Sequence, residues 1–164
     1  MKIRHIAATL LATGMAAMLS LGTISPASAA ATAVHPQVAP GAVLTKATIE
    51  FFTTSDDKDF DTFVATRVTD GASGRLVARA QSFYTHFNDH TDNGPFPLTI
   101  RSSETGDDLN FGSINVTITP NGHDTWNFSY VLELTFSDGS IEDIDSGPLH
   151  LTQDSRSNDH DLVF

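Results

Sequence analysis

The chain has 164 residues, no cysteine, and 20 acidic against 9 basic residues, which gives a formal net charge of −11 at pH 7. The absence of cysteine excludes disulfides and thiolate metal sites. The excess of negative charge disfavours binding to nucleic acid and to anionic membranes. Any metal site must therefore use oxygen or imidazole ligands.

Residues 1–29 have the pattern of a cleaved signal peptide. Lys2 and Arg4 precede an apolar run over 6–21, and Pro-Ala-Ser-Ala then supplies the small side chains that signal peptidase requires. We predict cleavage after Ala29 and a secreted protein. The apolar run is shorter than the roughly 20 residues that span a bilayer, so we expect no transmembrane segment in the mature chain.

The rest of the chain reads as a flexible leader, residues 30–43, followed by short β-strands. Segments rich in Val, Ile, Thr, Phe and Tyr are separated by Gly, Pro, Asn and Asp clusters, without helical periodicity. The expected strands cover residues 44–53, 62–69, 76–84, 96–102, 114–118, 126–136, 141–145 and 149–153. They predict an all-β fold, a single antiparallel β-sandwich of about eight strands over residues 44–153. Residues 154–164 are expected to form a loose, polar C-terminal tail.

The acidic residues gather in the loops of this expected sandwich. If consecutive strands alternate in direction, the first, third, fifth and seventh connections lie at one end. The first, third and fifth carry the candidate metal ligands Asp56, Asp57, Asp59, Asp61, Asp89, Asp92, Asn121 and Asp124. Calcium takes about six to eight oxygen ligands at flexible geometry. The sequence therefore predicts a calcium site at this end.

Two other chemistries remain open at the same end. His86, His90 and His123 could form a zinc or copper site together with Asp ligands. Asp57 and Asp124 could face each other as the carboxylate pair of a glycosidase. The chain has neither a Gly-x-Ser-x-Gly motif nor a thiol nucleophile, and we expect no catalytic activity.

Two stretches resemble a known kind of β-sandwich. Residues 48–59, Thr-Ile-Glu-Phe-Phe-Thr-Thr-Ser-Asp-Asp-Lys-Asp, with Asp-Thr-Phe-Val at 61–64, resemble the first strand and acidic loop of PLAT and C2-type domains. Residues 120–126, Pro-Asn-Gly-His-Asp-Thr-Trp, are similar to a later ligand loop of such domains. The resemblance implies calcium-assisted binding of a lipid, a membrane or a protein partner. The ligands that it implies are Asp56, Asp57, Asp59, Asp61 and Asp124.

These observations favour a secreted, calcium-binding, non-catalytic recognition module for an extracellular protein, lipid or glycan. The alternatives are a small secreted hydrolase and a metal-free acidic structural or interaction protein. The sequence favours no particular ligand and no particular oligomeric state.

Overall fold

The computed structural model describes residues 37–164, which form two antiparallel β-sheets and one short helix. The elements in chain order are β1 (Leu44–Thr53), β2 (Phe63–Thr69), β3 (Leu76–Ser82), β4 (Asp92–Pro97), β5 (Thr99–Ile100), α1 (Gly106–Leu109), β6 (Ser113–Thr119), β7 (Thr125–Phe136), β8 (Ile141–Asp145), β9 (Leu149–Thr152) and β10 (Ser157–Asp161). The predicted signal peptide lies outside the described residues.

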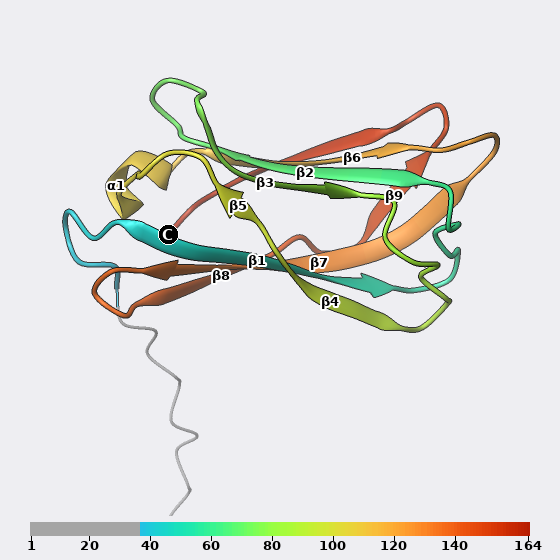
Figure 1. Ribbon diagram of the computed structural model, residues 1–164, viewed down its shortest axis with the longest axis horizontal. Coiled ribbons are helices and arrows are strands. Elements are labelled where there is room, and N and C mark those ends of the chain that lie inside the picture. The colour runs from blue at the N-terminus through green and yellow to red at the C-terminus, as the bar shows by residue number, and fades with distance from the viewer. Residues whose placement is uncertain (1–36) are drawn as a thin grey trace, which may run out of the picture. The chain divides into compact units, whose positions relative to one another are not determined.

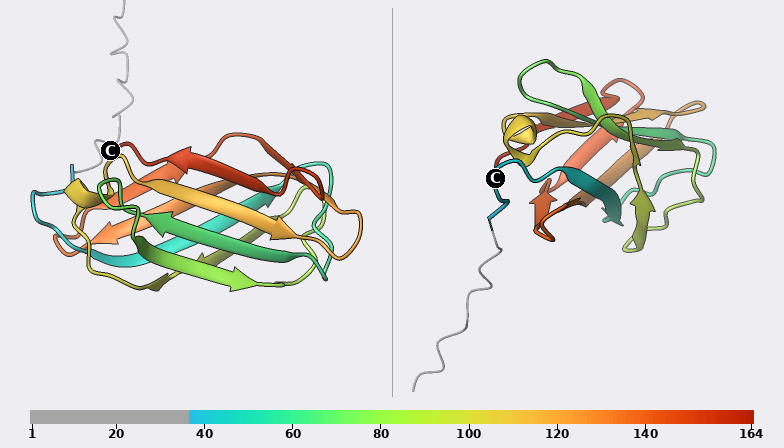
Figure 2. Two further views of the ribbon diagram at one scale, coloured as in Figure 1. Left: turned by 90° about the horizontal axis from the view of Figure 1, so that it is seen from above. Right: turned by 60° about the vertical axis from the view of Figure 1, so that its left-hand side comes forward.

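The two sheets pack against each other as the layers of a sandwich (Figure 1). One sheet has the strand order β4-β1-β7-β8, with β9 also paired to β7. The other has the order β10-β6-β2-β3-β5, and its strands lie side by side in the left view of Figure 2. All of these strand pairs are antiparallel. The predicted fold class is therefore confirmed.

Alternating side chains on facing strands build the core. β7 buries every second residue from Trp126 to Phe136, and β6 does the same from Ile114 to Ile118. Phe51 of β1 is fully buried, and its ring packs against the rings of Tyr84, Phe87, Phe96, Trp126 and Phe128. Because Tyr84 and Phe87 belong to the loop after β3, this aromatic cluster anchors that loop to the core.

The expected reversal of the chain at residues 145–148 is wrong. β8 and β9 both pair antiparallel with β7, at Val131↔Asp145 and Phe128↔Leu149, so they continue in one direction along the sheet edge. Ser146, between them, accepts a hydrogen bond from the Tyr130 N–H at 2.8 Å through its hydroxyl. The Ser-Gly-Pro sequence therefore makes an irregularity within one edge strand, and this connection does not join the loops at the end of the sandwich.

The expected strand over 96–102 is interrupted where the chain changes sheets. Leu98, between β4 and β5, is buried and donates its N–H to the Ala47 carbonyl of β1 at 2.9 Å. β4 therefore pairs with β1, whereas β5 pairs with β3 in the other sheet. Figure 1 shows the chain passing from β4 in one layer to β5 in the other.

Both flanks of the expected domain belong to the fold. The segment expected as a loose tail contains β10, which pairs with β6, and Leu162 beyond it is fully buried. In the expected leader, Ala42 is buried and Val38 packs against the core. The expectation of a flexible leader is therefore wrong for residues 37–43, and that of a loose tail is wrong for 154–164. The polar sequence of β10 gave no sign of a strand, because an edge strand can leave most of its side chains in solvent.

Candidate functional site

Three connections meet at one end of the sandwich, as strand parity predicts. They are the loops 54–62 (β1–β2), 83–91 (β3–β4) and 120–124 (β6–β7). Lys58 and Phe87 exchange backbone hydrogen bonds between the first two loops, with N–O distances of 3.2 and 3.1 Å. Asn121 of the third loop donates to the Asp61 carboxylate at 3.2 Å. Acidic residues that are distant in sequence are therefore neighbours in space.

Lys58 is the fully buried cation at the centre of these loops. Its side chain is 0 % exposed, and its ammonium donates to the carbonyl oxygens of Asp59 at 2.7 Å, Phe83 at 2.8 Å and Thr62 at 3.2 Å. The ammonium also lies 4.9 Å from the centre of the Phe87 ring, a cation–π distance. Burial lowers the pKa of Lys58, and the Asp124 carboxylate opposes that shift most strongly. Lys58 thus ties the loop 54–62 to the first residue after β3, Phe83.

Asp124 is the carboxylate that accompanies this buried charge. It is 8 % exposed, and its Oδ2 accepts a hydrogen bond from the Thr62 hydroxyl and another, at 3.4 Å, from the Asp59 N–H. A carboxylate with these partners organises the end of the first loop. Its role is therefore accounted for by protein groups alone.

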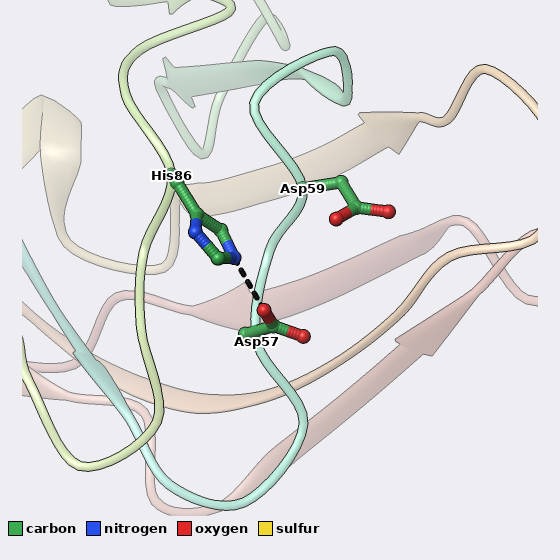
Figure 3. Close-up of side chains that lie close together, drawn as sticks. All are labelled: Asp57, Asp59 and His86. Atoms are coloured by element: carbon green, nitrogen blue, oxygen red, sulfur yellow. Dashed lines mark hydrogen bonds and ion pairs between the residues drawn. The ribbon is translucent and has the colours of Figure 1, made fainter.

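A second group of titratable side chains lies on the outside of the same loops. Asp57 and Asp59 flank Lys58 in sequence, and His86 approaches them from the loop after β3 (Figure 3). One ligand atom from each of the three residues lies within 4.8 Å of the others. The His86 Nε2 faces the Asp57 carboxylate directly, within hydrogen-bonding distance. All three side chains are accessible to solvent, so an ion could enter without any movement of the core.

This ligand set suits a divalent cation that accepts nitrogen as well as oxygen. Zinc binds imidazole nitrogen and carboxylate oxygen at about 2.0–2.2 Å, so ligand atoms this close need only side-chain rotation to share one ion. Calcium prefers an all-oxygen shell of about six to eight ligands. The carboxylates of Asp57 and Asp59 could contribute to such a shell only with several waters. The presence of His86 therefore favours zinc-like ions at this position.

The other predicted ligands do not join this group. Asp56 accepts a hydrogen bond from the Asn127 side chain on β7, and Asp61 accepts the one from Asn121. Asp89 is exposed in its loop, and Asp92 begins β4 opposite Phe52. Within residues 37–164, Asp57, Asp59 and His86 are the one group of three or more His, Asp or Glu side chains close enough to share an ion.

Exposed aromatic side chains border the same end. Phe60, in the first loop, is 72 % exposed, and Phe83, after β3, is 54 % exposed. The Phe83 ring stands edge-on to Phe63, with 5.2 Å between the ring centres. Phe63 and Phe83 line an open hollow, whose other lining residues are Asp61, Thr119, Pro120 and Asn121. Phe60 and this hollow are called the aromatic rim below.

Acidic residues at the opposite end are engaged differently. Arg75 forms an ion pair with Glu104 and lies 3.8 Å from the Asp70 carboxylate. Asp108 caps α1 through Thr105, whose hydroxyl holds the pKa of that carboxyl below its usual value. Asp70 and Glu104 share Arg75 and Asp108 caps the helix, so the described residues offer no comparable open ligand group at this end.

No family model matches this chain. No curated protein and no solved structure matches it either. Among the described residues, no helix has the length and apolarity needed to cross a bilayer. The resemblance to C2 and PLAT domains therefore stays a prediction, and the function has to be argued from the geometry of the site.

The role of Lys58 was beyond sequence reasoning. Lys58 reads as a solvated residue within an acidic run, because its carbonyl acceptor at Phe83 comes from a loop far away in sequence. His86, in contrast, is one of the three histidines that the sequence offers as zinc or copper ligands, and among the described residues it alone of the three lies with Asp57 and Asp59. The feature of the sequence that could have indicated the buried ammonium is the position of Lys58, a single basic residue among four aspartates.

Proposed function

We propose that the protein is a secreted, non-catalytic recognition module that binds one divalent cation through Asp57, Asp59 and His86. The observation that carries this proposal is the approach of the three ligand atoms to within 4.8 Å, although they come from two separate loops. Without a bound ion, the two negatively charged carboxylates of this group would have only one imidazole beside them. A divalent cation would neutralise both carboxylates and tie the two loops together.

The cation is proposed to be zinc-like, with calcium as the competing candidate. An imidazole ligand beside two carboxylates is the chemistry of zinc sites. Calcium, which the sequence predicts, would bind the same two carboxylates and leave His86 unligated. Replacing His86 should therefore weaken the binding of zinc and leave the binding of calcium unchanged.

Recognition is assigned to the aromatic rim beside the ion. Aromatic side chains, phenylalanine among them, are enriched in the interfaces of proteins relative to the rest of the surface. Phe60 follows Asp59 directly in the chain, so fixing the Asp59 carboxylate on an ion would also restrain the position of this ring. We propose that the rim contacts an extracellular protein, lipid or glycan. The signal-peptide pattern of residues 1–29 supports a location outside the cell.

Isothermal titration of zinc chloride and of calcium chloride into tag-free, metal-stripped protein tests the cation site. We expect zinc to bind with a stoichiometry of about one. His86→Gln and Asp57→Asn should each weaken zinc binding by at least roughly tenfold, since each removes one of three protein ligands. The matched controls His123→Gln and Asp89→Asn change exposed residues of neighbouring loops and should leave the affinity unchanged.

Two results would count against the proposal in different ways. Calcium binding that His86→Gln does not alter would replace the zinc-like site by an oxygen-only site. If neither salt gave heat of binding, the cation site would be rejected, and the metal-free interaction protein would become the better account.

A further inference from the structure

One edge of β3 is only partly covered. β2 pairs with β3 along its whole length, whereas β5 pairs with it only at Ala78 and Arg79. The chain leaves this edge at Leu98, which bonds to Ala47 of β1 instead. Among the described residues, no strand covers 80–82 on the side away from β2. This segment therefore presents the unpaired backbone groups of an open strand edge.

A groove of about 290 Å³ follows this open edge. Its floor and one wall are the run of β3 residues from Arg79 to Ser82. The other lining residues are Tyr84, from the loop after β3, and Phe96, Pro97, Thr99 and Arg101, from the chain that crosses between the sheets beside β3 in Figure 1. The volume lies at the small end of the range for ligand sites, so the groove suits a short extended segment better than a folded domain.

The charge of the groove is opposite to that of the protein. Arg79 and Arg101 both line it, in a chain whose net charge is −11. Among residues 37–164, the basic side chains that contact a carboxylate are Lys46, Arg75 and His86, so both arginines of the groove lack a carboxylate partner. Arg67 stands directly opposite Arg79 on β2, and like charges in that position destabilise a sheet. An acidic ligand would relieve this repulsion.

We propose that this groove binds an extended, acidic peptide segment of a partner protein as an added β-strand. The open edge of β3 supplies backbone hydrogen bonds along 80–82, which is how strand addition gains affinity. Arg79 and Arg101 select carboxylate side chains, because a guanidinium pairs with a carboxylate through two parallel hydrogen bonds. Tyr84 and Phe96 offer an apolar surface to the alternate side chains of the peptide. The site is separate from the cation site and does not depend on the proposed function.

Fluorescence polarisation with a labelled, end-capped peptide of alternating Glu and Val tests the proposal. We expect saturable binding to the whole protein, and no binding of the Lys-Val counterpart. Arg79→Gln and Arg101→Gln should each weaken binding roughly tenfold, the loss expected for one charge-assisted contact. Arg156→Gln, an exposed arginine outside the groove, is the matched control and should change nothing. Asp57→Asn should also bind the peptide normally.

The same peptide with N-methyl groups on alternate residues separates strand addition from simple charge attraction. We expect it to bind at least roughly tenfold more weakly, because N-methylation removes backbone donors and keeps the carboxylates. Equal binding of both peptides would overturn the strand mode. Binding of an acidic oligosaccharide in the absence of peptide binding, or the same loss in Arg156→Gln as in Arg79→Gln, would overturn the assignment of the groove to a peptide.

Discussion

Replacing Lys58 by methionine should destabilise the fold strongly, because the new side chain matches lysine out to Cε but lacks the ammonium and its hydrogen-bond donors. Within residues 37–164, the carbonyl oxygens of Thr62 and Phe83 receive their side-chain hydrogen bonds from Lys58 alone. A buried acceptor without a partner costs about 1–3 kcal/mol. Removal of the buried ammonium offsets part of that cost, since its desolvation is unfavourable. We expect a net loss of about 3 kcal/mol in the free energy of unfolding.

Urea unfolding followed by circular dichroism measures this loss, and the melting temperature should fall by roughly 10–15 °C for a domain of this size. Lys46→Met is the matched control, because Lys46 makes an exposed ion pair with Glu133 at 2.8 Å. An exposed pair contributes at most about 1 kcal/mol. If Lys58→Met were no less stable than Lys46→Met, the buried ammonium would not hold these loops together.

Two further predictions concern acid stability and the aromatic core. Hydrogen bonds from the Ser140 hydroxyl and from the Ala39 N–H lower the pKa of Asp138 from 3.8 to about 2, so its stabilisation is complete above pH 4 and is lost as the pH falls through 2. Asp138→Asn should therefore lose less stability than wild type between pH 4 and pH 2 in urea titrations, and an unchanged pH profile would refute this role. Phe51→Ala should cost about 3–5 kcal/mol in the same assay, because a fully buried ring is removed from the core. Phe60→Ala, at 72 % exposed, should stay within about 0.5 kcal/mol of wild type, and equal losses in the two variants would contradict the assigned packing.

The fold could be predicted because its central strands carry a simple period. Ile114, Val116 and Ile118 alternate with polar residues, and each is fully buried in β6. Strand parity then placed the first, third and fifth loops at one end without any knowledge of contacts. The parity argument failed only at residues 145–148, because Gly and Pro are as suitable for an irregularity within a strand as for a reversal.

The interior of the site could not be predicted, because it depends on contacts between distant loops. Local sequence makes Asp124 look like a metal ligand, whereas its partners are the Thr62 hydroxyl and the Asp59 backbone. Lys58 supplies a positive charge at the place where the sequence suggested a metal. Asp57 and Asp59 remain available for a cation because they lie outside this buried arrangement, together with His86.

The most direct measurement of the cation site is a long-range ¹H–¹⁵N spectrum of the histidine rings during titration with zinc. We expect the Nε2 resonance of His86 to shift on addition of one equivalent, since this nitrogen faces Asp57. The rings of His123 and His150 should stay unchanged at that point. If the His86 ring were unaffected at saturating zinc, or if all histidine rings shifted together, the proposed site at Asp57, Asp59 and His86 would be contradicted.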